Sequence, residues 1–76
     1  MARDRLPPYL RIADDLRRKI TDGVWLPGEQ VPSLDKLSDE YSVSRVTARK
    51  AVLLLVEEGL LETRPAWGTF VAERNS

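Results

Sequence analysis

The spacing of apolar residues between helix-breaking residues constrains the fold of this chain more than any other feature. Pro7 and Pro8 suit the first turn of a helix, because the N–H that proline lacks would be unpaired there anyway. Apolar residues then recur at intervals of three and four, at Tyr9, Ile12, Ala13, Leu16 and Ile20. This period predicts a helix with one buried face, and Gly23 is expected to end it.

Two further helices are predicted from their capping residues. Ser33 can cap a short helix that extends to about Tyr41, and Ser44 can cap a longer one that extends to about Glu58, before Gly59. The expected inward residues are Leu34, Leu37 and Tyr41 in the first of these, and Ala48, Ala51, Val52 and Leu55 in the second. Because only Ser42 and Val43 separate the two helices, their connection must be tight.

The remainder of the chain predicts short β-structure. Residues 60–64 and 69–72 have the pattern of two strands, joined by a four-residue turn of Pro65, Ala66, Trp67 and Gly68. In the turn-rich connector before the second helix, Trp25 and Leu26 are expected to lean on the core, and Val31 to form a single bridge of sheet.

The predicted fold class is therefore mainly α with a small β-hairpin (α+β), a three-helix winged helix-turn-helix. This domain would occupy residues 8–72, between a flexible N-terminal tail (1–7) and a C-terminal tail (73–76).

Composition excludes several classes of function. Among the 76 residues there is no Cys and no His, which removes disulfides, thiol nucleophiles and the usual zinc ligands. The carboxylates are scattered, and no nucleophile motif or Gly-rich phosphate loop is present. We therefore expect no enzyme activity, no metal and no cofactor. With no long apolar run and no signal-peptide pattern, a cytoplasmic protein without a membrane partner is expected.

The charge distribution is more informative than the net charge. Lys and Arg balance Asp and Glu at 12 each, which predicts weak non-specific binding to nucleic acid. Residues 41–56, however, contain no acid, and Arg45, Arg49 and Lys50 lie in this stretch. Because exposed charges act over a Debye length of about 10 Å, the local field is the relevant one.

Residues 43–50 have the composition of a DNA-contacting helix start. Arg45 and Arg49 are four residues apart and so share one helix face. Val46 follows Arg45 and is expected to contact DNA with them. A guanidinium group matches the O6/N7 acceptor pair of guanine, or a phosphate. Ser44 and Thr47 add hydroxyls where a helix N-terminus already favours phosphate. The alternative is an ordinary solvated face, with Ser44 acting as a cap alone.

Several motifs occur in the order and at the spacing of a known family. They are Pro-Tyr-Leu-Arg-Ile-Ala (8–13), Leu-Pro-Gly-Glu (26–29), Val-Pro-Ser (31–33), Val-Ser-Arg-Val-Thr-Ala-Arg (43–49), Glu-Gly-Leu-Leu (58–61) and Gly-Thr-Phe-Val (68–71). Together they resemble the N-terminal winged helix-turn-helix domain of GntR-family bacterial transcription regulators, most closely the HutC-like branch.

The resemblance implies a role for each matching residue. Helix 44–58 would enter the major groove, where Arg45 and Arg49 would contact bases. Ser33, Ser44 and Thr47 would hold phosphates. The wing, residues 60–72, would lie at the backbone or minor groove, and Gly68 would let it approach the duplex closely.

Three positions depart from the family pattern. Asp35 replaces a DNA-contacting Arg, and would be repelled by phosphate or accept from a cytosine amino group. Trp67 comes after Ala66 where Gly-Arg is usual, and either contacts DNA or packs on its own hairpin. Lys50 replaces an acid and restores one positive charge near the groove.

A fourth departure lies at the C-terminal side of the wing. Family members continue into an effector-binding domain that pairs two subunits, whereas this chain has only residues 73–76 there. The chain is either a miniature regulator or a fragment of a longer one. Leu53, Leu54 and Val56 make the helix apolar all round, so they form either a dimer or partner contact or an ordinary intramolecular one.

The sequence thus favours a sequence-specific regulator that binds double-stranded DNA. A repressor is favoured over an activator, and its expected location is the nucleoid. Two copies, as a possible homodimer, would bind a short inverted repeat. The alternative is a winged-helix protein-interaction module that acts as an accessory factor to another regulator. That alternative is favoured by the zero net charge, Asp35, the uncharged wing tip and the apolar stripe on the third helix.

Overall fold

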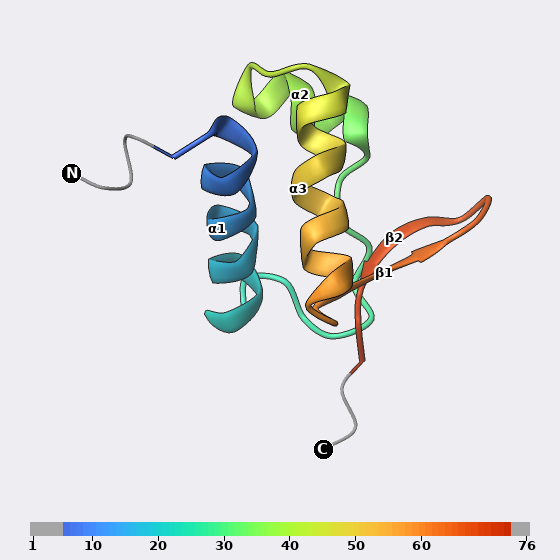
Figure 1. The fold of residues 1–76 in the computed structure, drawn as a ribbon. Coiled ribbons are helices and arrows are strands. Elements are labelled where there is room, and N and C mark those ends of the chain that lie inside the picture. Colours follow the sequence, from blue (N-terminus) through green and yellow to red (C-terminus); the bar gives the residue numbers. More distant parts are fainter. Residues whose placement is uncertain (1–5, 74–76) are drawn as a thin grey trace.

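The computed structural model describes residues 6–73, and it has the architecture of a winged helix-turn-helix (Figure 1). Helices α1 and α3 lie side by side, α2 crosses one end of them, and a hairpin projects from the foot of α3. The elements are α1 (Pro8–Thr21), α2 (Leu34–Tyr41), α3 (Arg45–Glu57), β1 (Leu61–Arg64) and β2 (Gly68–Val71). The predicted fold class is confirmed. Most of both predicted tails lies outside the described residues.

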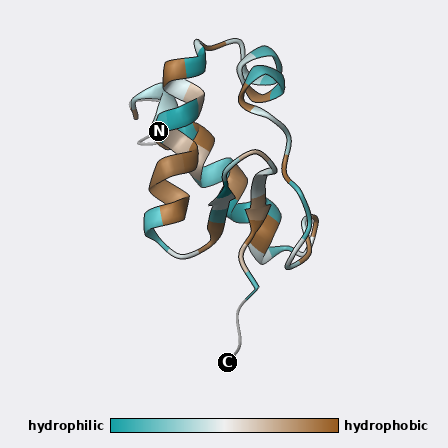
Figure 2. Cartoon of the chain, turned by 90° about the vertical axis from the view of Figure 1, so that its right-hand side faces the viewer, coloured by the Kyte–Doolittle hydropathy of each residue, from teal (hydrophilic) through white to brown (hydrophobic). Residues whose placement is uncertain are grey.

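The core forms between α1 and α3, as the apolar period predicted. Ile12, Ala13 and Leu16 of α1 are buried, and Tyr9 and Ile20 are partly buried against them. The facing residues of the other elements are Trp25, Val31, Leu37, Ala48, Ala51, Val52, Leu55, Leu61 and Val71. The second half of α3 is hydrophobic along its length, whereas α2 is mostly hydrophilic (Figure 2).

Two serine caps and one left-handed residue define the helix-turn-helix. The Ser33 hydroxyl accepts the Lys36 backbone N–H at 3.3 Å, and the Ser44 hydroxyl accepts that of Thr47 at 3.2 Å. Each such cap stabilises its helix by about 1 kcal/mol. Between the helices, Ser42 adopts φ 55°, in the left-handed region, and its N–H bonds back to the Asp39 carbonyl. These local bonds fix the direction in which α3 leaves α2.

The hairpin is antiparallel, and its turn is shorter than predicted. Gly68 already pairs with Arg64, so the turn comprises residues 65–67 rather than four residues. The Trp67 N–H donates to the Arg64 carbonyl at 2.9 Å, and Ala66 has φ 70°. With Pro65 before it, this is the pattern of a type II turn, in which the third position needs a positive φ.

The connector before α2 adds a third segment to the hairpin. The residue opposite Phe70 is Gln30, not Val31 as predicted. The Val31 N–H does bond to the Thr69 carbonyl at 2.9 Å, but in an antiparallel ladder such a bond can flank a directly opposed pair. Val31 itself is buried in the core.

The expectation for the connector's two apolar residues was half right. Trp25 is buried, with the Lys19 ammonium 5.2 Å from its ring centroid, whereas Leu26 is exposed. Leu26 begins a tight turn, in which its carbonyl accepts from the Glu29 N–H at 3.0 Å. The chain reverses direction there and leaves Leu26 on the outside. No helix in residues 6–73 is long and apolar enough to cross a membrane.

Candidate nucleic-acid interface

The first two turns of α3 present polar side chains to solvent. Ser44, Arg45 and Arg49 are exposed, as is the apolar Val46, while Ala48 on the opposite side is buried in the core. Arg49 forms no ion pair or hydrogen bond with another residue in the range 6–73. Its full set of guanidinium donors is therefore available to an external acceptor.

Arg45 is held differently from Arg49. Its Nε lies 2.9 Å from Oδ1 of Asp35, in the first turn of α2. Both side chains remain mostly exposed, at 66% for Arg45 and 76% for Asp35. Sequence reasoning treated Asp35 as a carboxylate facing DNA and missed this partner. One of the two predicted base-contacting charges is thus compensated within the protein.

Of the three predicted phosphate ligands, Thr47 and Ser33 keep a hydroxyl donor available, whereas Ser44 uses its own within the helix start. Ser44 accepts the Thr47 N–H and also donates its hydroxyl to Oγ1 of Thr47 at 3.1 Å. Since Thr47 Oγ1 acts as the acceptor in that bond, its own hydroxyl hydrogen can still be donated. The Ser33 hydroxyl accepts in its cap and keeps its hydrogen in the same way. Capping and phosphate binding are therefore compatible.

The wing tip presents an aromatic side chain rather than a charge. The Trp67 side chain is 75% exposed, so it is not packed on its own hairpin. The Gln30 side-chain amide donates to the Trp67 carbonyl at 3.0 Å. A Cβ at Gly68 would lie 2.7 Å from that amide nitrogen. The absence of a side chain at Gly68 therefore has a reason inside the domain, besides the predicted approach to DNA.

The hairpin's own arginine is engaged within the wing. Arg64 forms an ion pair with Glu62, and its guanidinium lies 4.7 Å from the ring centroid of Phe70. The hairpin projects sideways from the helices, and its tip is tilted toward the end of the molecule where α2 and the start of α3 lie (Figure 1). A winged helix with its wing and the start of its third helix toward one side has the layout that contacts a duplex.

Comparison with known proteins decides the family. The family model described as "Bacterial regulatory proteins, gntR family" matches residues 8–71. The chain belongs to the GntR family. Its winged helix is the DNA-binding domain of that family, and the resemblance inferred from the motifs is confirmed.

Individual relatives agree with this GntR assignment. The mannosyl-D-glycerate transport/metabolism system repressor MngR of Escherichia coli strain K12 is 43% identical over 67 residues, which cover 88% of this chain and 28% of MngR. The histidine utilization repressor of Klebsiella aerogenes is 39% identical over 67 residues, with the same two shares. This chain thus spans about a quarter of the length of these curated relatives.

Solved structures give the same picture. The AraR DNA-binding domain in complex with operator ORE1 is 39% identical, with a TM-score of 0.86 over 88% of this chain and 82% of that one. YtrA from Sulfolobus acidocaldarius, described as a GntR-family transcription factor, is 30% identical, with a TM-score of 0.87 over 93% of this chain and 74% of its own.

Lys50 of this GntR-family domain is tied to α1. Its ammonium lies 5.5 Å from the centroid of the Tyr9 ring, a contact worth about 0.5–1 kcal/mol at an exposed site. Lys50 therefore keeps its charge near the start of α3 but has a partner of its own. Tyr9 is also partly buried against the core, so α1 takes part in positioning this cation.

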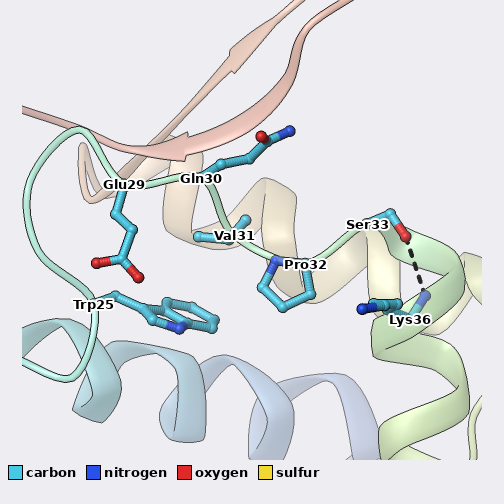
Figure 3. Close-up of a pocket in the computed structure, with 7 residues that line it drawn as sticks. All are labelled: Trp25, Glu29, Gln30, Val31, Pro32, Ser33 and Lys36. Atoms are coloured by element: carbon cyan, nitrogen blue, oxygen red, sulfur yellow. Dashed lines mark hydrogen bonds between the residues drawn. The ribbon is translucent and has the colours of Figure 1, made fainter.

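The connector between α1 and α2 pairs with the wing at Gln30 before it reaches the start of α2. An open hollow lies along it, and in Figure 3 the Gln30 amide points toward the strands at one end while the Ser33 cap closes the other. Its lining residues are Trp25, Glu29, Gln30, Val31, Pro32, Ser33 and Lys36. Gln30 pairs with Phe70 of the wing, and Ser33 follows three residues later in the same segment, so the connector links the wing to the start of α2.

The three apolar residues predicted as a dimer or partner contact separate into two groups. Leu54 and Val56 are partly buried and pack against the core of their own domain, which is the intramolecular alternative. Leu53 is 46% exposed. Of the three, Leu53 is thus the residue best placed to contact another molecule.

The foot of α3 is anchored away from these exposed groups. Arg17 donates to both carboxylate oxygens of Glu58, at 2.9 and 2.7 Å. This hydrogen-bonded pair holds the pKa of Glu58 below its usual value and raises the pKa of Arg17. Nearer the start of α3, the Tyr41 hydroxyl donates to Asp15 at 2.8 Å, and burial, together with that bond, raises the pKa of Tyr41.

Proposed function

We propose that this domain binds a specific sequence of double-stranded DNA and regulates transcription there, with α3 in the major groove and the wing at the backbone or minor groove. The observation that carries the proposal is the exposed start of α3. Arg49 lies there without a partner among the described residues, near the Ser44 hydroxyl that caps the helix. The structural similarity to an AraR domain solved with its operator supports the same placement.

Each exposed group has a chemical role in this proposal. Arg49 donates two hydrogen bonds to O6 and N7 of a guanine, and Val46 packs on a thymine methyl group. Ser33 and Thr47 donate their hydroxyls to phosphates, Ser44 orients Thr47 through its own hydroxyl, and Lys50 adds a nearby positive charge. Trp67 packs on the sugars at the edge of the groove, next to Gly68, where the missing side chain lets the hairpin approach the duplex.

Repression by two copies on a short inverted repeat is part of the proposal. Relatives named as repressors support the direction of regulation. The argument for two copies is energetic, because a chain with zero net charge binds nucleic acid weakly and needs a second contact to reach useful affinity. A regulator of this kind acts at the nucleoid, in the cytoplasm.

Selection of bound sequences from a random duplex pool tests this function. We expect a consensus with two related half-sites, and binding that keeps its sequence preference as salt rises. Binding that shows no preference and disappears at moderate salt would contradict the proposal. That result would instead favour the protein-interaction alternative.

Self-association has a separate test at Leu53. Leu53→Glu is expected to abolish any pairing of two copies while leaving the fold intact, as measured by sedimentation and thermal melting. A double change that includes Leu54 would be less informative, because Leu54 packs against the core. Leu26→Glu, at another exposed leucine, is the matched control. A wild-type chain that stays monomeric at high concentration would rule out Leu53 as the contact.

A further inference from the structure

The contact between Asp35 and Arg45 requires an explanation beyond stability. An ion pair as exposed as this one adds little to the stability of the fold. Asp35 also lies in the first turn of α2, where any acid is favourable to the helix dipole. Neither effect requires the carboxylate to contact the next helix. The Asp35 carboxylate lies beside the proposed DNA-contacting end of α3, so its effect on DNA binding should pass through Arg45.

The chemistry of the guanidinium group shows what this contact does. Five N–H donors lie in one plane, and Nε carries one of them. The contact with Asp35 is an ion pair without a hydrogen bond, with Nε 2.9 Å from Oδ1, and it leaves at least the four N–H donors of the terminal nitrogens available. A bidentate contact with guanine needs only two of these. Arg45 can therefore stay paired with Asp35 and contact a base at the same time, and the pair draws the guanidinium group toward α2.

Electrostatics adds a penalty for the wrong target. A carboxylate near the duplex is repelled by phosphates, and it offsets the attraction of Arg45 for them. This cost applies to every DNA sequence. Hydrogen bonds to a base offset this cost only where the base acceptors lie within reach of Arg45 in its pair with Asp35. Arg49, which has no such carboxylate among the described residues, does not carry this restriction.

We infer that Asp35 is a positioning residue that sets sequence specificity through Arg45, at the expense of overall affinity for DNA. The inference rests on the function proposed above. It reverses the role of this position, which in the family pattern carries a DNA-contacting Arg. Here the side chain restrains a cation of the neighbouring helix instead of supplying one.

The test compares Asp35→Asn with wild type on defined DNA. The probes are a random-sequence duplex, the duplex that the wild-type chain selects from a random pool, and all single base-pair variants of that duplex. Arg45→Ala first identifies the base pair that Arg45 contacts, as the position where preference is lost. Asp39→Asn is the matched control, since Asp39 lies one turn further along α2 and forms no ion pair within residues 6–73.

Three changes are expected for Asp35→Asn. Discrimination at the Arg45 base pair falls by about fivefold or more, as for loss of a well-oriented bidentate contact. Affinity for the random duplex rises, and the log–log salt slope steepens by about 0.9, as for one added phosphate contact. Asp39→Asn leaves discrimination unchanged. In the Arg45→Ala background, Asp35→Asn has no further effect on discrimination, because its partner is gone.

Other outcomes overturn the inference in distinct ways. A uniform gain in affinity with unchanged discrimination would make Asp35 a repulsive charge and nothing more. A loss of preference that persists in the Arg45→Ala background would mean that Asp35 contacts a base itself. Failure of the wild-type chain to select any consensus would overturn the proposed function, and this inference with it. Asp35→Ser, which also suits the start of a helix, replaces Asp35→Asn if thermal melting shows that the latter is unfolded.

Discussion

The start of α3 and the tip of the wing would contact DNA in different ways. The start of α3 carries Arg45 and Arg49, with its backbone fixed by the Ser44 cap. The wing tip carries Trp67, and the nearby Arg64 is engaged by Glu62 and Phe70. The first region supplies directional, charge-assisted hydrogen bonds, and the second supplies apolar surface. Sequence preference should therefore depend on α3, and the wing should add affinity that salt hardly changes.

The largest expected effect comes from removing the unpaired arginine. Arg49→Ala should cost roughly 1–3 kcal/mol of binding free energy and relax preference at one base pair. Binding titrations on the selected duplex and its single base-pair variants measure both. Arg18→Ala, at an exposed arginine near the far end of α1, serves as the control. If Arg49→Ala weakened every sequence equally, Arg49 would be a phosphate contact and the contrast between the two regions would fail.

A smaller loss is expected at the wing. Trp67→Ala should weaken binding by about 1 kcal/mol, roughly fivefold in Kd, because it removes apolar surface from the contact. Titration at several salt concentrations should give an unchanged log–log slope, since Trp67 carries no charge. A changed slope would indicate that the wing positions a cation. Unaltered affinity would remove the wing tip from the interface.

The turn below Trp67 offers a gain in stability. Ala66 has φ 70°, and a left-handed conformation costs a residue with a Cβ about 1–2 kcal/mol. Ala66→Gly should raise the free energy of unfolding by about 0.5–1 kcal/mol, after allowing for the extra freedom of glycine in the unfolded chain. Thermal and denaturant melts measure this gain, and Ala72→Gly, outside the turn, should not reproduce it. DNA affinity should stay the same, because only the backbone of the turn is relieved.

The smallest expected effect is a dependence of stability on pH at the foot of α3. The pKa of Glu58 is lowered in the folded domain by the hydrogen bonds from Arg17. Its contribution is therefore present above the pKa of the unfolded chain and is lost as pH falls through the lower folded pKa. Because the pair is about one-third exposed, it should contribute only a few tenths of a kcal/mol.

Melts of Glu58→Gln and wild type between about pH 3 and about pH 7 test this sign. The difference between the two proteins should shrink toward the acidic end. Glu57→Gln, at a neighbouring acid with no ion pair in the described range, should show no such trend. DNA binding at neutral pH should be the same for all three, since this pair lies away from the proposed interface.

The helices, their caps and the exposed residues at the start of α3 could all be predicted from the amino-acid sequence. They depend on interactions within a few positions along the chain, such as the Ser33 and Ser44 caps and the apolar period of α1. The motif order also identified the family. Errors arose where neighbouring segments decide the geometry, as when Gly68 pairs with Arg64 and shortens the turn, or when Gln30 rather than Val31 lies opposite Phe70.

The tertiary arrangement, in contrast, determines which charged and aromatic side chains have a partner within the protein. The contacts of Asp35 with Arg45, of Lys50 with Tyr9, and of Gln30 with the Trp67 carbonyl each join different elements. No local period encodes such contacts, because they depend on how α2 crosses α3 and where the hairpin projects. Sequence reasoning could count the cations of this domain. Packing determined that Arg49 stands without a partner among residues 6–73, whereas Arg45 is restrained.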